Sequence, residues 1–151
     1  MDKAYTESIT IPEGKTITLD LNGQTLINEE GKHTITNEGT LTIVGTGTVD
    51  NVSHGKGAVY NDAGATCTIL GGNYTRSQEN GQSDSDSGGN SWYAIKNFGT
   101  MTIGEEGAPN DAVKVSFTGK YSSLVANGWQ DGAAAGQPNK EPAYERDAQL
   151  T

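Results

Sequence analysis

One short phrase recurs along this chain: an aliphatic residue, any residue, Asn, a nearby Gly, and then alternating Thr and apolar residues. Copies lie at residues 35–43, 59–69 and 95–103, and a partial copy lies at 125–128. Identical β-turn-β phrases stack on one another and bury a shared core. The repeat therefore constrains the architecture more than any other feature of the sequence, while it says much less about activity.

The intervals between copies indicate the size of the repeating unit. The Asn residues of the phrase stand at positions 37, 61, 97 and 127, so the intervals are 24, 36 and 30 residues. About 24 residues form one coil of three short strands with their turns, at roughly 3.3 Å per strand residue. The longer intervals are one coil plus a loop, which is tolerated because loop-closure entropy grows slowly with length. Residues 12–19 resemble a degenerate first copy with Pro12 in the Asn position. We expect an all-β parallel β-helix of about four to five coils, in a single domain over residues 1–151 with its repeat coils at about 8–128.

Apolar residues alternate with threonine inside each copy, as in a strand with one buried face. The threonines should face outward, because β-branching favours extended backbone and the hydroxyl is solvated there. Cys67 falls in the same position as Leu41 and Met101, which favours a small core side chain over a reactive thiol. The predicted core consists of Ile35, Leu41, Ile43, Val59, Cys67, Ile69, Ile95, Met101, Ile103 and Val125.

The Asn positions form a column of their own. Asn tolerates the left-handed conformation expected at a sharp bend, and its side chain bonds to local backbone groups. Coils stacked about 4.8 Å apart would also let the amides hydrogen-bond to one another, as stacked Asn does in cross-strand arrays. The following Gly allows the turn without a Cβ clash. We predict a ladder made of Asn37, Asn61, Asn97 and Asn127.

Residues 9–26, ITIPEGKTITLDLNGQTL, resemble the opening coil of right-handed parallel β-helices of the pectate-lyase-like class. The phrase Thr-Leu-Thr-Ile-x-Gly, which recurs in that class, stands here at residues 40–45 with variants at 66–71 and 100–104. The resemblance covers about residues 8–128. It implies a right-handed helix from a large secreted or surface protein of a Gram-positive, often gut-dwelling, bacterium, and hence an extracellular location. The class includes lyases, hydrolases, adhesins and passive stalks, so the resemblance specifies fold more than activity.

Charge and hydropathy narrow the set of partners. The net charge of −9 disfavours nucleic acid, whose phosphates it would repel. No stretch approaches the roughly 20 apolar residues that span a bilayer, so we expect no membrane insertion. We also find no signal peptide at the N-terminus of this sequence, so a secreted parent would carry it elsewhere.

The last four residues, 148–151, have the pattern of another coil's first strand, so we expect the parent protein to continue and this coil stack to be truncated. An open β-helix end exposes unpaired strand edges. End-to-end self-association is therefore expected.

Two polar insertions, at residues 76–91 and 129–147, are the expected places for function, because loops on a repeat scaffold are free to vary. Trp92, Tyr93 and Trp129 flank them, and exposed aromatic side chains stack on sugars or anchor protein partners. The simpler alternative is that the tryptophans only fasten the loops. Tyr60 and Lys96, on the same column beside the turn, are the next candidates for a contact surface.

Asp84 and Asp86 offer oxygens to a calcium ion, but the loop lacks a full calcium-binding pattern. We therefore expect no metal site and no cofactor.

Catalytic patterns are weak. The strands present Thr where an enzyme of this fold would present carboxylates, and His33 and His54 have no Ser or Asp at motif spacing. Arg76 and Arg146 both fall in the polar insertions. We predict a non-catalytic segment that acts as a stalk or as an adhesin-like module for glycan or host protein. The alternatives are the N-terminal coils of a polysaccharide lyase or glycoside hydrolase whose active site lies outside this fragment, and, less favoured, a phage-tail fibre segment.

Overall fold

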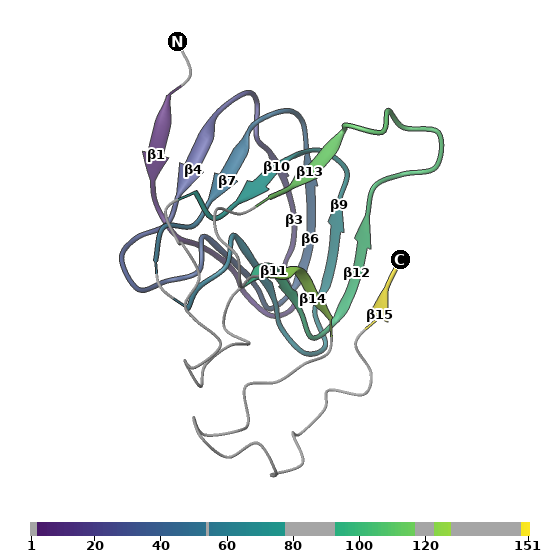
Figure 1. The fold of residues 1–151 in the computed structure, drawn as a ribbon. Helices are drawn as coiled ribbons and strands as arrows, with labels where there is room; N and C mark the ends of the chain where they lie inside the picture. The colour runs from purple at the N-terminus through teal and green to yellow at the C-terminus, as the bar shows by residue number, and fades with distance from the viewer. Residues whose placement is uncertain (1–2, 54, 78–92, 117–122, 128–148) are drawn as a thin grey trace.

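The chain folds into a right-handed parallel β-helix of about five coils (Figure 1). A computed structural model describes residues 3–53, 55–77, 93–116, 123–127 and 149–151. Each coil contributes one strand to each of three parallel sheets, which we name A, B and C. The all-β class and the helical stacking predicted from the repeat are confirmed.

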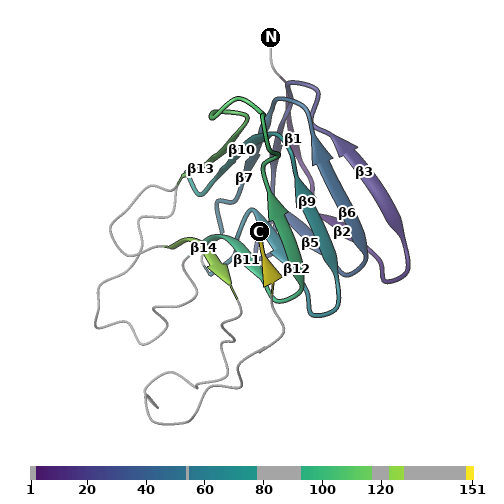
Figure 2. The same cartoon turned by 90° about the vertical axis from the view of Figure 1, so that its right-hand side faces the viewer.

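The strands of the three sheets follow one another in strict rotation along the chain. Sheet A contains β1 (Ala4–Thr6), β4 (Thr25–Ile27), β7 (Thr48–Asp50), β10 (Gly72–Thr75) and β13 (Val113–Val115). Sheet B contains β2 (Ile9–Ile11), β5 (Ile35–Asn37), β8 (Val59–Asn61), β11 (Tyr93–Asn97) and β14 (Ser123–Asn127). Sheet C contains β3 (Thr16–Asp20), β6 (Thr40–Val44), β9 (Thr66–Ile69), β12 (Thr100–Ile103) and β15 (Gln149–Leu150). In Figure 2 the strands of sheet C lie side by side in this order.

The core fills the inside of the coils, in register from one coil to the next. Leu41, Cys67 and Met101 are lateral partners in sheet C, and each is at most 1% exposed. Burial raises the pKa of the Cys67 thiol to about 12, so the sulfur stays protonated in the core. Ile103 and Val125, near the C-terminal end, are only partly buried against it. The other predicted core residues are fully buried: Ile35, Ile43, Val59, Ile69 and Ile95.

The outer face of sheet C is lined by two columns of threonine. Thr40, Thr66 and Thr100 are lateral partners in one column and are exposed. In the second column, two residues further along each strand, Thr42, Thr68 and Thr102 are half-buried. Threonine suits this outer face because β-branching favours the extended backbone.

A ladder of buried side-chain amides runs along the corner between sheets B and C. Asn37 Nδ2 donates to Asn61 Oδ1, Asn61 Nδ2 to Asn97 Oδ1, and Asn97 Nδ2 to Asn127 Oδ1, each at 2.7 Å. The first three residues are fully buried. Their amides also bond to the backbone of the turn, for example Gly39 N–H to Asn37 Oδ1 at 3.2 Å. The ladder predicted from the spacing is present.

Two predictions about this column are wrong. Ile11, not Pro12, occupies the Asn position in the first coil, because Ile11 is the lateral partner of Asn37. The ladder residues are also not left-handed: among the described residues, Asn22 is the one non-glycine with a positive φ, at 45°. The amide is selected at the corner by its hydrogen bonds rather than by its backbone conformation.

A glycine stands two residues after the ladder asparagine in two of the coils, where the backbone of the neighbouring coil lies very close. A Cβ added at Gly39 would lie 2.5 Å from the carbonyl oxygen of Pro12, and one at Gly99 would lie 2.2 Å from that of Ala65. Neither distance is sterically allowed. The turns that contain Pro12 and Ala65 are two residues longer, and Gly64 bends one of them at a φ of 79°. Long and short turns therefore alternate, and each short turn fits under the carbonyls of the long turn before it.

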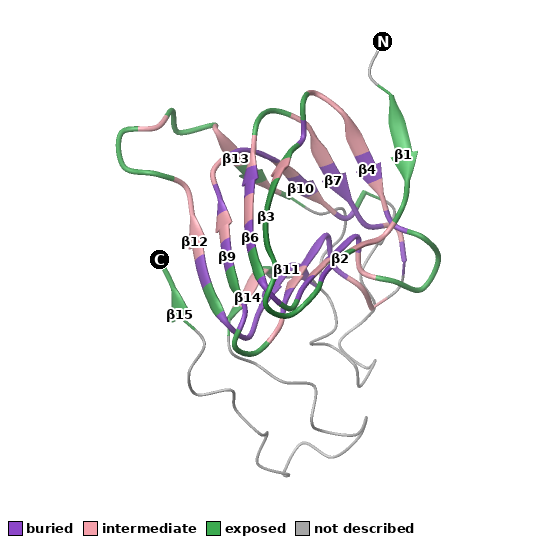
Figure 3. Cartoon of the chain, turned by 180° about the vertical axis from the view of Figure 1, so that it is seen from behind, coloured by how far each residue is buried: buried purple, intermediate pink, exposed green. Residues whose placement is uncertain are grey.

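The end coils leave part of the inner row uncovered (Figure 3). Ile17 is the lateral partner of Leu41, yet Ile17 is 44% exposed and Leu41 is 1% exposed. At the other end Leu150, partner of Met101, is 43% exposed. The strands β1, β3 and β15 are mostly exposed for the same reason.

The ladder yields a stability prediction. Asn61→Leu should reduce the free energy of unfolding by about 1–3 kcal/mol, because it removes the buried amide bonds that Asn61 makes with Asn37 and Asn97 in the two neighbouring coils. Thr68→Ala, on the outer face of sheet C, should cost well under about 1 kcal/mol. Urea unfolding of both variants measures the difference. Equal small effects would contradict a structural role for the ladder.

Candidate functional site

The outer face of sheet B carries a cleft beside the coil corner. Its central column is Thr36, Tyr60, Lys96 and Ala126, which are lateral partners in successive coils. The cavity has a volume of about 320 Å³, and we call it the aromatic cleft. The described residues that line it are His33, Thr36, Gly55, Lys56, Tyr60, Tyr93, Lys96 and Phe98.

Four aromatic rings in the cleft form one contiguous surface. The centroids of His33 and Tyr60 are 4.6 Å apart with an interplanar angle of 27°, and those of His33 and Tyr93 are 6.5 Å apart at 22°. Phe98 meets Tyr60 edge-on, with a centroid distance of 5.6 Å and an angle of 67°. All three distances lie in the favourable range for aromatic pairs, about 4.5–7 Å. The rings come from three consecutive coils, so the β-helix assembles a surface that no single coil contains.

A glycine between two rings makes this arrangement possible. His33, Gly57 and Tyr93 each stand two residues before an aliphatic residue of the repeat, and those aliphatic residues pair in register. A Cβ at Gly57 would lie 3.1 Å from two ring carbons of Tyr93. The missing side chain therefore lets His33 and Tyr93 face each other across the middle coil. Sequence reasoning missed His33 as a site residue. The usable signal was its position two residues before the aliphatic residue of the repeat, which is also the position of Tyr93.

Lys96 lies in the cleft with its charge against aromatic rings. Its Nζ is 4.7 Å from the ring centroid of Tyr93 and 4.8 Å from that of Phe98, the geometry of a cation–π contact. Lys96 and Tyr93 are each only 3% exposed. Both were expected on an accessible surface, and that expectation is wrong, because both side chains are buried. Tyr60 remains half-buried.

His33 is neutral at physiological pH. Its Nδ1 accepts a hydrogen bond of 3.0 Å from Gly57 N–H, so this nitrogen carries no proton and Nε2 carries it instead. Burial, followed by the positive charges of Lys56, Lys96 and Arg76, lowers the pKa of His33 from 6.5 to about 4. The imidazole thus serves as a stacked ring and a hydrogen-bond donor rather than as a cation.

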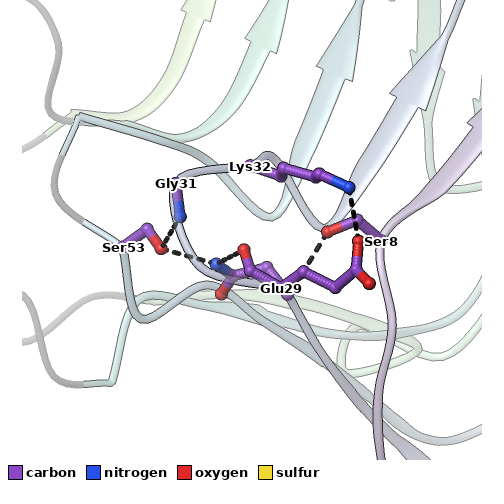
Figure 4. A network of polar contacts seen from close by, with 6 residues as sticks. Ser8, Glu29, Gly31, Lys32 and Ser53 are labelled. Carbon is purple, nitrogen blue, oxygen red and sulfur yellow. Dashed lines mark hydrogen bonds and ion pairs between the residues drawn. The ribbon is translucent and has the colours of Figure 1, made fainter.

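A polar network fastens the segment that carries His33 (Figure 4). Asn28 Nδ2 donates to Ser53 Oγ at 2.7 Å and to the carbonyl of Glu29 at 2.7 Å. Gly31 N–H also donates to Ser53 Oγ, at 2.9 Å, and Glu29 N–H donates to Ser8 Oγ at 3.0 Å. These bonds join three successive coils, so they restrain the loop without help from the hydrophobic core.

Asn28 belongs to a second polar column, at the corner between sheets A and B. Ile27, Asp50 and Thr75 are lateral partners, so the residues that follow them, Asn28, Asn51 and Arg76, are equivalent. Asn51 Nδ2 donates to the carbonyl of Gly57 at 2.9 Å. Arg76 was expected in a solvated insertion, but it is fully buried, and its Nη2 donates to Ser53 O at 3.4 Å. The cause is its register, because it takes an inward corner position before the insertion begins.

Several predicted residues lie outside the described part of the chain, namely Trp92, Trp129, Asp84, Asp86, His54 and Arg146. Within the described ranges, no three or more His, Cys, Asp or Glu side chains gather where they would hold a metal ion. The described residues also contain no helix that is long and apolar enough to cross a membrane.

No family model, no curated protein and no solved structure matches this chain. The aromatic cleft and the scaffold that positions it are therefore the basis for inferring function.

Because the pKa of His33 is lowered in the folded state, we predict that protonation of His33 reduces the free energy of unfolding in acid. Its folded-state pKa of about 4 lies below the unfolded value of 6.5, so this contribution is complete above pH 6.5 and is lost as the pH falls through 4. The slope should reach at most about 1.4 kcal/mol per pH unit. His33→Gln removes the titration, so its unfolding free energy should fall less between neutral pH and pH 4.5 than that of the wild type. Urea unfolding at both pH values measures this, and an identical fall in both proteins would contradict the assignment.

Proposed function

We propose that this chain is a non-catalytic β-helical module of a secreted or cell-surface bacterial protein, of the pectate-lyase-like type found in Gram-positive bacteria. In this proposal it acts as an adhesin-like module that binds a glycan through the aromatic cleft. The observation that carries the proposal is the cluster of four rings beside a cavity of about 320 Å³, in which His33 and Tyr60 are half-buried and Tyr93 and Phe98 are buried. Aromatic faces stack on the apolar faces of sugar rings, and the cavity is at the lower end of the range for small-ligand sites.

The scaffold supports a binding role because it holds the cleft rigidly. Tyr60 and Lys96 lie in the adjacent strands β8 and β11, which are hydrogen-bonded to each other. The asparagine ladder joins the same two strands through Asn61 and Asn97. Sites built on such elements are more precise than sites on free loops. The outward rows of sheet C offer threonine rather than paired acids, which favours binding over hydrolysis as the role of these coils.

Tyr60 is the residue whose removal tests the proposal. Tyr60→Ala should weaken glycan binding by about tenfold or more, because it removes the half-buried ring at the centre of the cleft. Tyr5→Ala is the control: it removes the same side chain from a position in the first coil that is 41% exposed and outside the cleft. A glycan array followed by titration calorimetry gives the affinities, and circular dichroism checks folding. Equal binding by both variants, binding to host proteins alone, or no binding by the wild type would contradict the proposal.

We also propose that the 151-residue chain associates end to end. The exposed inner-row residues Ile17 and Leu150 lie at opposite ends, and parallel strand edges there permit head-to-tail stacking. Ile17→Lys should lower the weight-average mass measured by sedimentation across a range of protein concentrations. Thr18→Lys, exposed on the outer face of the same strand, should not. A monomeric wild type at every concentration would refute the association.

A further inference from the structure

We propose that the outer face of sheet C binds to the surface of ice crystals through the threonines that its strands present. We call this surface the threonine face. It lies on a different sheet from the aromatic cleft, so the inference does not rest on the proposed function. It goes beyond that function by assigning a ligand to a second surface of the scaffold.

Threonine fills almost every position of the threonine face. Each strand of sheet C places one residue on either side of an inward residue, as β6 places Thr40 and Thr42 around Leu41. The lateral pairing of the strands arranges these residues in two columns that extend over five coils. The first column is Thr16, Thr40, Thr66, Thr100 and Gln149, and the second is Thr18, Thr42, Thr68, Thr102 and Thr151.

The uniform composition of the threonine face is not required by the fold. Valine, isoleucine and the aromatic residues favour strands as threonine does. Accordingly, the outward columns of the other two sheets are mixed: Ala4, Thr25, Thr48, Asn73 and Lys114 in sheet A, and Thr10, Thr36, Tyr60, Lys96 and Ala126 in sheet B. Charged residues make up 19% of the sequence, yet none stands in either threonine column. A property other than strand formation therefore accounts for this face.

The stacked coils give the threonine face two regular repeats. Neighbouring strands are about 4.8 Å apart, and alternate residues of a parallel strand are about 6.6 Å apart. The oxygen atoms on a prism face of hexagonal ice form a rectangular lattice with repeats close to these two lengths. A single hydrogen bond contributes little free energy, so recognition of such a lattice needs many hydroxyls in register. The two columns supply them.

The scaffold keeps this array regular. The ladder amides bond from coil to coil at 2.7 Å, at the corner where the strands of sheet C begin. Sheets of many strands stay flat where side-chain ladders hold them, and the strands of sheet C lie side by side (Figure 2). The β-branched threonine side chain has few χ1 rotamers, so the positions of hydroxyl and methyl repeat from strand to strand.

The chemistry of the threonine face is matched to water in a lattice. A hydroxyl donates and accepts hydrogen bonds, as each water molecule of ice does. Thr40, Thr66 and Thr100 are exposed, so the first column is accessible along its length. Water molecules held by hydroxyls in fixed positions have already lost part of their freedom, which lowers the entropic cost of their joining a crystal.

The test measures how much of the full chain enters ice that grows slowly on a cold finger. The wild type should be enriched in the ice, whereas an ordinary soluble protein is left in the liquid. Thr66→Tyr should lose this enrichment, because it places a ring in the middle of the array while keeping a high strand propensity. Thr10→Tyr is the matched control, since it makes the same exchange at an exposed outward position of sheet B. Thr40→Lys, with Thr10→Lys as its control, repeats the test one coil earlier with a charge in place of a ring.

Circular dichroism of each variant checks that it is folded, and a pull-down on crystalline cellulose tests the other kind of neutral, periodic solid. Enrichment of the wild type and of the sheet B variants in ice, with loss in the sheet C variants, supports the inference. Exclusion of the wild type from ice would overturn it. So would equal enrichment of the folded sheet C and sheet B variants. Binding to cellulose that Thr66→Tyr abolishes, without entry into ice, would assign the face to a polysaccharide surface instead.

Discussion

The buried amide ladder is the interaction on which the rest of the molecule depends. A side-chain amide placed in an apolar corner costs about 1–3 kcal/mol for each donor or acceptor that stays unpaired. Asn37, Asn61 and Asn97 avoid this penalty only when the coils stack in one register, because each needs the next amide and the next turn's carbonyl. A slip of one residue would replace an amide by a hydroxyl, an aromatic ring or a charged group, because the residues beside the ladder are Thr36, Tyr60 and Lys96 on one side and Glu38, Asp62 and Phe98 on the other. The ladder therefore stabilises the stack and also excludes other stackings.

A fixed register turns sequence-distant residues into neighbours. Tyr60 and Lys96 are 36 positions apart, yet they are lateral partners, because the extra residues between these coils leave the corner unchanged. His33 reaches the same face from the preceding coil, held by the polar network around Ser53. The scaffold thus separates two tasks: buried columns set the spacing of the coils, and outward columns and turns carry the side chains that line the aromatic cleft.

The sequence predicted what depends on periodicity and missed what depends on turns. The alternation of Leu41, Cys67 and Met101 with threonine, and the asparagine column, follow from the strand period and the coil interval. Pro12 was misplaced because the first turn is two residues longer than the next, and such a difference leaves no mark in the strand pattern. His33 and Phe98 lie outside or beside strand ends, where side-chain direction follows from local geometry. The burial of Lys96 was not predictable from alternation, which assigns its position to solvent.

Lys96 is the residue of the cleft that departs most from the pattern of the repeat. Burying an ammonium group is unfavourable unless other groups compensate, and an apolar side chain at this outward position would pack against Tyr93 and Phe98 without that penalty. The same column holds Thr10 and Thr36 in the first two coils and Tyr60 in the third, so nothing in the repeat requires a cation here. Departures from the locally favourable choice concentrate at functional sites. A buried ammonium group packed against two aromatic rings is such a departure, and it supports the proposal that the aromatic cleft is a binding site.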